Sequence, residues 1–396
     1  MSATFDGLWD ELAPVGRHPG TGGYRRYAWT AEDATLREWF AGAADARGLD
    51  LTTDRAGNQW AWWGDPDAKP GLVVGSHLDS VPDGGAFDGP LGVVSAFAAL
   101  DALRERGLEP ARPIGVVNFG DEEGARFGIA CAGSRMITGA LRADRALALR
   151  DADGVPMAEA MTRAGREVSL VGRDDETLAR IGTFVELHVE QGRGLVDLGR
   201  PVAVGAGIWP HGRWRIELPG QANHAGTTRL ADRRDPMLAL AEVVQRARSA
   251  AAERDCVATC GKVRVEPNGV NAIASLVRVW LDARGSRPDP VRAVVADIAE
   301  LVEEHGGELT EESWTDRTPF DESLAHELSR LLDDAPRLET GAGHDAGILA
   351  AAGVATAMLF VRNPTGVSHS PQEFAERDDC VAGVDALAAV IRELSR

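Results

Sequence analysis

Apolar and polar residues alternate in blocks along the first half of the chain, and the blocks predict strands and helices in turn. The apolar runs that begin segments 71–80 and 113–124 are short, and each run ends in polar residues, as buried strands do. Between them, residues 90–107 have a wide apolar face and close at Gly107, which is typical of a helix end. This alternation predicts an α/β domain with a mostly parallel sheet and helices on both faces.

A second region, from about residue 213 to 314, has a different order. Its periodicity predicts strand, helix, two strands, helix and strand (βαββαβ) in about 100 residues, which is the size of a separate α+β domain. From about Pro319 the chain returns to helix, strand and helix. We therefore expect a discontinuous first domain of residues 1–208 and 316–396, with residues 209–315 inserted into it.

Composition narrows the class of protein. The 396 residues carry a formal net charge of −19, which argues against nucleic acid or an anionic membrane as the main partner. We find neither the features of a signal peptide at the N-terminus nor an apolar run of the roughly 20 residues that cross a bilayer. The four cysteines fit no common zinc spacing, and free thiols in a cytoplasmic protein are the expectation.

Polar residues at the expected strand ends are candidates for chemistry, because ligands collect beyond the carboxyl ends of such strands. His77 ends one strand, and Asp79 two residues later is placed to hold its second ring nitrogen. Asp88 lies in a glycine-rich turn close enough to share an ion with His77, although it also reads as an ordinary turn residue. In the adjacent pair Glu122 and Glu123, one carboxylate can bind a metal while the other takes a proton.

Two further histidines favour a metal site. His188 follows an acid in the alternating segment 184–192, and His369 lies in a loop after an apolar strand. With Asp88, Glu123 and His77 they form an oxygen and nitrogen ligand set that suits divalent zinc, manganese, cobalt or nickel. The set contains no thiolate, so a structural cysteine-type zinc site is disfavoured.

These segments together resemble a known group of enzymes. The motifs GSHLDSV, FDGPLGV, DEEGARF, ELHVEQG, QANHAGTT, GAGHDA and GVSHSP occur in the order of the N-carbamoyl-L-amino acid hydrolase, allantoate amidohydrolase and beta-ureidopropionase family. That family belongs to the dinuclear metallohydrolases related to aminoacylases and carboxypeptidases. The resemblance extends from about residue 8 to the end of the chain.

The resemblance implies a role for each matching residue. His77 and His188 would each bind one metal, and Asp88 would bridge two metals. One ion would be held by His77, Asp88 and His188, and Glu123 and His369 would complete the ligands of the other ion. Sequence alone does not assign ligands to ions. Glu122 would be the general base and Asp79 would orient His77; Asp121 has no assigned role. In the insertion, His224 would stabilise the oxyanion, often in the active site of a dimer partner. The implied substrate contacts are Asn271, Arg284, Gln191, His211 and His344.

The implied reaction is metal-dependent hydrolysis of the ureido C–N bond of an N-carbamoyl-L-amino acid or a related ureido acid, with release of ammonia and carbon dioxide. Allantoate hydrolysis, deacylation or dipeptide hydrolysis on the same scaffold are alternatives, and a non-catalytic binding protein or a structural metal protein is disfavoured because Glu122 and every ligand are present. Departures from the family lie in the insertion: NAIAS at 271–275, TRLADRRDPM at 228–237, and His211 where allantoate-type enzymes tend to have glutamine. The insertion would act as a lid and dimerisation domain, with the glycine-rich segment 204–209 as a hinge.

Overall fold

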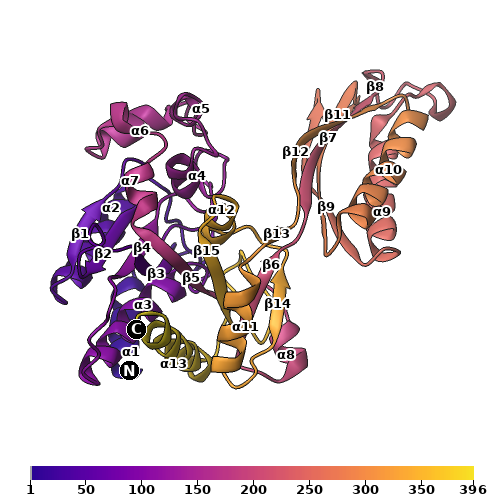
Figure 1. Ribbon diagram of the computed structural model, residues 1–396. Helices are drawn as coiled ribbons and strands as arrows, with labels where there is room; N and C mark the ends of the chain where they lie inside the picture. Colours follow the sequence, from indigo (N-terminus) through magenta and orange to yellow (C-terminus); the bar gives the residue numbers. More distant parts are fainter. Residues whose placement is uncertain (1) are drawn as a thin grey trace. The chain divides into compact units, whose positions relative to one another are not determined.

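The structure, a computed structural model, describes residues 2–396 and divides into two compact units (Figure 1). One unit runs up to Gly207 and resumes with Pro319–Arg396, and the other is Ile208–Thr318. The second unit is thus an insertion into the first. Its function as a lid or dimerisation domain stays a prediction.

The first unit is built on a sheet whose central strands β4, β3, β5 and β15 are parallel, in agreement with the prediction. The nine strands are ordered β1-β2-β4-β3-β5-β15-β6-β13, and β14 pairs with β6. Parallel pairing joins β3 to β4, β3 to β5 and β5 to β15, so these strands present their carboxyl ends at one edge. The strands are β1 Asp50–Thr53, β2 Gln59–Trp63, β3 Gly71–His77, β4 Ile114–Phe119, β5 Ile181–Val189, β6 Val202–Ile208, β13 Thr318–Pro319, β14 Arg337–Thr340 and β15 Ala355–Val361.

Helices of this unit cover both faces of the sheet. Val74, Val185 and Leu359 share one core with α1, α2, α3, α11 and α13, while the strand neighbours Val73 and Phe184 are buried outside that core. Because successive side chains point to opposite faces, the second set faces the other side, where α12 packs on β5 and β15. The helices are α1 Ser2–Leu12, α2 Ala31–Asp45, α3 Pro90–Glu105, α4 Ala132–Thr138, α5 Ala143–Ala148, α6 Met157–Arg163, α7 Asp175–Ala179, α8 Gly194–Leu198, α11 Glu322–Leu331, α12 Asp345–Ala351 and α13 Arg377–Leu394, with the 3-10 turn η1 Val168–Leu170.

Local signals in the sequence place two of these helices. Thr30 caps α2 and accepts a hydrogen bond from the Asp33 amide, a role that threonine commonly has at a helix N-terminus. The helix α3 begins with Pro90 at its first turn and ends just before Gly107, whose φ of 74° only glycine adopts readily. The short helices α4 to α7 lie in a stretch where periodicity is weak, and the sequence did not predict them.

The inserted unit has the predicted order of strands and helices. Its four-stranded antiparallel sheet is ordered β12-β7-β11-β9, and α9 and α10 share one apolar core with it. A separate two-stranded sheet pairs β8 with β10. The elements are β7 His211–Pro219, β8 Asn223–His224, η2 Leu230–Asp232, α9 Pro236–Ala252, β9 Cys256–Glu266, β10 Ala272–Ile273, β11 Leu276–Gly285, α10 Pro288–Glu304 and β12 Glu308–Thr315.

Two further sequence expectations concern chain segments. The segment 204–209 lies almost wholly within strand β6, which pairs antiparallel with β15, so its glycines belong to a sheet rather than to a loop. Hinge motion there stays a prediction. No helix among residues 2–396 is both long enough and apolar enough to cross a membrane. The four cysteines are free thiols, as expected.

Candidate metal centre

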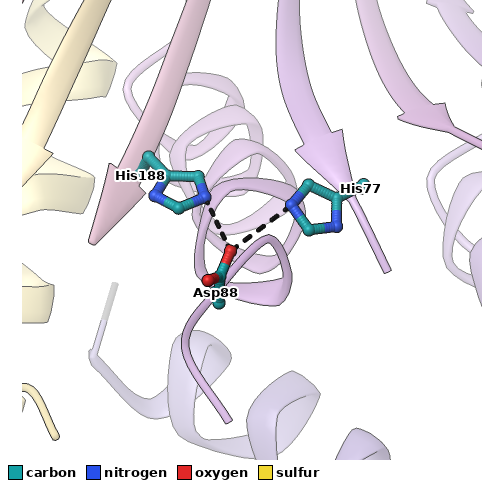
Figure 2. A group of neighbouring side chains, drawn as sticks. All are labelled: His77, Asp88 and His188. Carbon is teal, nitrogen blue, oxygen red and sulfur yellow. Dashed lines mark ion pairs between the residues drawn. The ribbon is translucent and has the colours of Figure 1, made fainter. Parts of the chain in front are cut away.

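Two histidines and an aspartate meet at the carboxyl edge of the parallel sheet. His77 is the last residue of β3, His188 is the last but one of the neighbouring strand β5, and Asp88 lies in the turn before α3. Figure 2 shows both imidazole rings directed at one carboxylate oxygen of Asp88. The Nε2 atoms of His188 and His77 lie 3.1 and 3.5 Å from Asp88 Oδ1. We call these three buried residues the first ligand group.

A second ligand group, Asp88, Glu123 and His369, uses the other oxygen of the same aspartate. His369 Nε2 lies 3.4 Å from Asp88 Oδ2 and 3.6 Å from Glu123 Oε2. His369 has 52% of its side chain exposed, whereas Asp88 is buried. Asp88 therefore offers one oxygen to each group, which is the arrangement that a bridging carboxylate needs.

The donor atoms fit divalent cations. Among the described residues, Nε2 of His77, Nε2 of His188 and Oε1 of Glu123 are buried without a hydrogen-bond partner, and each such atom costs about 1–3 kcal/mol when left unsatisfied. Burial, and then the charge of Asp88, raises the pKa of Glu123 to about 7. A cation would satisfy these atoms and offset the repulsion, and the imidazole and carboxylate set suits zinc, manganese, cobalt or nickel.

A third grouping, Glu186, His188 and His344, also brings three possible ligands together. The Glu186 carboxylate already accepts hydrogen bonds from the Ser76 hydroxyl at 2.7 Å and the Ala346 amide at 3.1 Å. His188 directs its Nε2 at Asp88 instead. We therefore assign this grouping no ion.

The orientation of the histidines is set by their second ring nitrogens. Nδ1 of His77 lies 3.2 Å from the Asp79 carbonyl oxygen, and Nδ1 of His188 lies 2.8 Å from that of Val189. A carbonyl oxygen only accepts, so Nδ1 of each ring donates a proton to it, and Nε2, directed at Asp88, is the ring atom that would bind a cation.

Asp79 does more than face His77. Its Oδ1 and Oδ2 accept hydrogen bonds from the backbone amides of Glu122 at 3.1 Å and Glu123 at 3.0 Å. The same side chain lies 3.4 Å from His77 Nδ1. Asp79 thus ties the end of β3 to the glutamate pair that follows β4.

Glu122 is a buried carboxylate that belongs to neither ligand group. Its Oε2 lies 3.7 Å from His77 Nε2, and its Oε1 accepts a hydrogen bond from the Cys131 thiol at 3.2 Å. Burial raises the pKa of Glu122 well above its usual range, and the charges of Glu123 and Asp345 add to the rise, while His77 opposes it. A carboxyl group tuned in this way is suited to accepting and returning a proton.

The turn that carries the acids is held by its own backbone. Asp121 and Gly124 have φ of 56° and 62°, and a Cβ on Gly124 would meet the Ile129 backbone at 2.4 Å, so that position needs glycine. Both carboxylate oxygens of Asp121 are buried without a hydrogen-bond partner among the described residues. Burial raises its pKa well above the usual range. Its function remains unassigned.

Gln191 and His344, expected to contact substrate, lie beside the ligand groups. Gln191 Nε2 donates to Asp88 Oδ2 at 2.9 Å and to Ser368 Oγ at 3.2 Å. His344 packs edge-on against His188, with ring centroids 4.5 Å apart, and burial lowers its pKa well below the usual value. Contact of either residue with a substrate stays a prediction.

The other predicted site residues lie in the inserted unit and form two pairs at opposite ends of β7 and β11. One pair is His224 and Asn271: His224 pairs with Ala272, the residue after Asn271, in the small sheet of β8 and β10. This pair follows the end of β7 and β11 at which Pro219 faces Leu276. His224 Nδ1 accepts the Gly226 amide at 3.0 Å, so in the neutral ring Nε2 carries the proton.

At the other end, Arg284 faces His211 across the strands. Arg284 donates two hydrogen bonds to Asp282, at 2.6 and 2.9 Å. His211 Nδ1 lies 2.9 Å from the Trp209 carbonyl, and burial lowers the pKa of this histidine. Its Nε2 is therefore an acceptor.

The structure adds three polar residues that the sequence analysis did not identify. Cys131 contacts Glu122, Ser368 Oγ lies 3.3 Å from Asp88 Oδ2, and the Glu373 carboxylate accepts the amide of Asp88 at 3.0 Å. Cys131 follows its partner Glu122 by nine residues, whereas Glu373 is 285 residues from Asp88 along the chain. The one sequence feature that could have pointed to Ser368 and Glu373 is that both lie close to His369 along the chain.

Comparison with known proteins supports the same chemistry. The sequence matches the description "Peptidase family M20/M25/M40" over residues 73–393. An N-carbamoyl-L-amino acid amidohydrolase of Geobacillus stearothermophilus is 36% identical over 405 residues, which cover 98% of each chain. An allantoate amidohydrolase of Escherichia coli strain K12 is 31% identical over 404 residues, 97% of this chain and 96% of the relative.

A solved structure, an amidase of the hydantoinase/carbamoylase family from Burkholderia vietnamiensis, is 28% identical with a TM-score of 0.88, and covers 100% of this chain and 97% of its own. These matches confirm the predicted family resemblance, the fold class and a hydrolase that acts on non-peptide C–N bonds. Since the match spans most of the sequence, the chain belongs to peptidase family M20/M25/M40.

Proposed function

We propose that this protein is a metal-dependent amidohydrolase that cleaves the ureido C–N bond of an N-carbamoyl-L-amino acid or a related ureido acid. One observation carries the proposal. A buried carboxylate with a raised pKa, Glu122, lies beside two three-residue ligand groups that share Asp88. This is the geometry in which one group of residues holds cations and a separate one moves protons.

His77, Asp88 and His188 would hold one divalent ion, and Asp88, Glu123 and His369 the other. When bound, such ions polarise the substrate carbonyl and lower the pKa of water. Glu122 accepts a proton from the attacking water and returns it to the leaving nitrogen. Asp79 keeps Glu122 in place through its backbone amide.

Substrate recognition would come from the inserted unit. The planar guanidinium of Arg284 suits a carboxylate, and its two hydrogen bonds to Asp282 fix its orientation. Asn271 would assist it, and the Nε2–H of His224 would donate to the oxyanion. Gln191, His211 and His344 would line the site.

Glu122→Gln tests the proposal directly. The variant is to be loaded with zinc, manganese, cobalt or nickel, and ammonia release measured on N-carbamoyl-L-amino acids. Metal content should match the wild type, while kcat falls by about 10²–10⁴, the usual contribution of general acid–base catalysis. Asp121→Asn, which removes a neighbouring buried acid, is the matched control and should retain turnover. Full activity of Glu122→Gln, or a wild type that binds no divalent ion, would contradict the proposal.

Allantoate hydrolysis is the second candidate, and the Escherichia coli relative favours it. His211 favours the first candidate. Its Nε2 is a hydrogen-bond acceptor, whereas the glutamine that allantoate-type enzymes tend to have at this position could also donate a hydrogen bond. Deacylation and dipeptide hydrolysis use the same ions on a plain amide. One substrate panel with allantoate, N-acyl amino acids and dipeptides ranks these activities by kcat/KM.

We also propose that the inserted unit joins two copies of the chain. Its strand β9 is at a sheet edge and exposes Val257 and Val263, and Leu230 and Leu238 are 81% and 68% exposed. Exposed apolar side chains next to an open strand edge favour association. Light scattering should show a dimer, and Val263→Lys should yield monomer; a monomeric wild type at micromolar concentration would contradict this.

A further inference from the structure

Glu373 lies between the chain segments that carry Asp88 and His369. Its carboxylate is buried, with 5% of the residue exposed. Oε1 accepts the backbone amides of Phe87 at 2.8 Å and Asp88 at 3.0 Å. Oε2 accepts the Ser368 hydroxyl at 3.2 Å. One oxygen therefore holds the turn of Asp88, and the other holds the residue next to His369.

The turn before Asp88 is shaped to meet this carboxylate. A Cβ on Gly85 would lie 2.3 Å from Glu373 Oε1, so only glycine permits the approach. The Phe87 ring packs against Phe374, with centroids 6.2 Å apart, and against Trp9 at 4.9 Å. Backbone and side chains of this turn are thus docked on the segment that follows His369.

A second connection runs through Ser368. Its Oγ lies 3.3 Å from Asp88 Oδ2 and accepts a hydrogen bond from Gln191 at 3.2 Å. The hydroxyl has one proton to share between Asp88 and Glu373, so its position couples the two carboxylates. Glu373 itself belongs to neither ligand group.

We propose that Glu373 is a positioning residue for the two-ion centre, because it fixes Asp88, the ligand common to both groups, against the His369 loop. The inference rests on the proposed function. Without Glu373, the adjacent amides of Phe87 and Asp88 lose their acceptor and the turn that aims Asp88 relaxes. Both ions would then be held more weakly, while the rest of the sheet edge is unchanged.

The test compares metal affinity in the full chain for Glu373→Ala, Glu373→Gln and the control Glu376→Gln, which removes an exposed charge three residues away. Mn²⁺, Co²⁺ and Zn²⁺ are titrated against a chromophoric chelator, and the Co²⁺ absorption spectrum reports ligand geometry. Glu373→Ala should bind about 10- to 100-fold more weakly, as expected when a residue that supports a ligand is lost. Glu373→Gln keeps an oxygen for the two amides and should stay near wild type, as should Glu376→Gln.

Unfolding of each metal-free variant is measured in parallel, to separate affinity from stability. Glu373→Ala with wild-type metal affinity and Co²⁺ spectrum would overturn the inference, even if its stability fell. Equal loss in Glu373→Gln or in Glu376→Gln would also overturn it, because charge rather than the hydrogen bonds would then be responsible. If Glu373→Ala does not fold, Glu373→Asp decides: it keeps the charge on a shorter side chain, so it should bind metal more weakly with an altered Co²⁺ spectrum, and wild-type affinity and spectrum would overturn the inference. A wild type without metal affinity would instead refute the proposed function, and this inference with it.

Discussion

Asp79 is the residue through which the two strand ends of the site are joined, so its replacement by asparagine is informative. Each carboxylate oxygen accepts one backbone amide, that of Glu122 or that of Glu123. Asparagine offers one oxygen, and its NH₂ group would face the second amide. One buried amide is then left unsatisfied, at a cost of about 1–3 kcal/mol.

If Glu122 and Glu123 shift to relieve the unsatisfied amide, the same free energy is added to the activation barrier of the reaction. A loss of 1–3 kcal/mol corresponds to roughly a 5- to 150-fold lower kcat, with KM little changed. Ammonia release by the metal-loaded Asp79→Asn variant measures both constants. Asp321→Asn, which replaces the aspartate that caps α11 by accepting one amide, is the matched control and should be silent. A wild-type kcat in Asp79→Asn would refute the argument.

Three further predictions test single interactions. Cys131→Ala should lower kcat by about two- to tenfold, because Glu122 loses one weak donor; Cys131→Ser should restore it, and equal rates in all three proteins would contradict the contact. Arg284→Lys should raise KM for carboxylate substrates about tenfold or more, since a lysine cannot form the fork; an unchanged KM on an N-carbamoyl amino acid would exclude Arg284 from binding. Burial raises the pKa of Asp54 to about 6, despite hydrogen bonds from Asn58 and Trp60. The folded chain therefore binds a proton at Asp54 that the unfolded chain releases, so this group alone should lower the free energy of unfolding by about 3 kcal/mol as pH rises from about 4 to 6. Buried carboxyls of the candidate metal centre, such as Glu123 with a pKa raised to about 7, contribute a fall of the same sign in the metal-free protein. Urea unfolding should therefore show a fall in both proteins that is about 3 kcal/mol smaller in Asp54→Asn; an equal fall in the two proteins would refute the assignment to Asp54.

Much of the fold follows from local pattern. The apolar runs at β3, β4 and β15 and the helix α3 are short-range features, and their predicted type is what the structure shows. The helices between Ala132 and Ala179 were not predicted because they are short and depend on packing against one another. The glycines of segment 204–209 suggested a loop, whereas residues 202–208 form strand β6, whose first part pairs with β15; hinge motion at this segment stays a prediction.

The sequence by itself determined which residue types stand at the strand ends: His77, Glu122, Glu123 and His188 follow or end apolar runs, and parallel strands bring such ends to one edge. The tertiary structure alone decided which of them meet. It divided Asp88 between His188 and His369 and placed Cys131 on Glu122. It also brought Glu373, 285 residues along the chain, to the amide of Asp88. The physical reason is that periodicity reports burial and direction within one element, whereas a contact across the chain depends on how several elements pack, for which a single sequence carries no local signal.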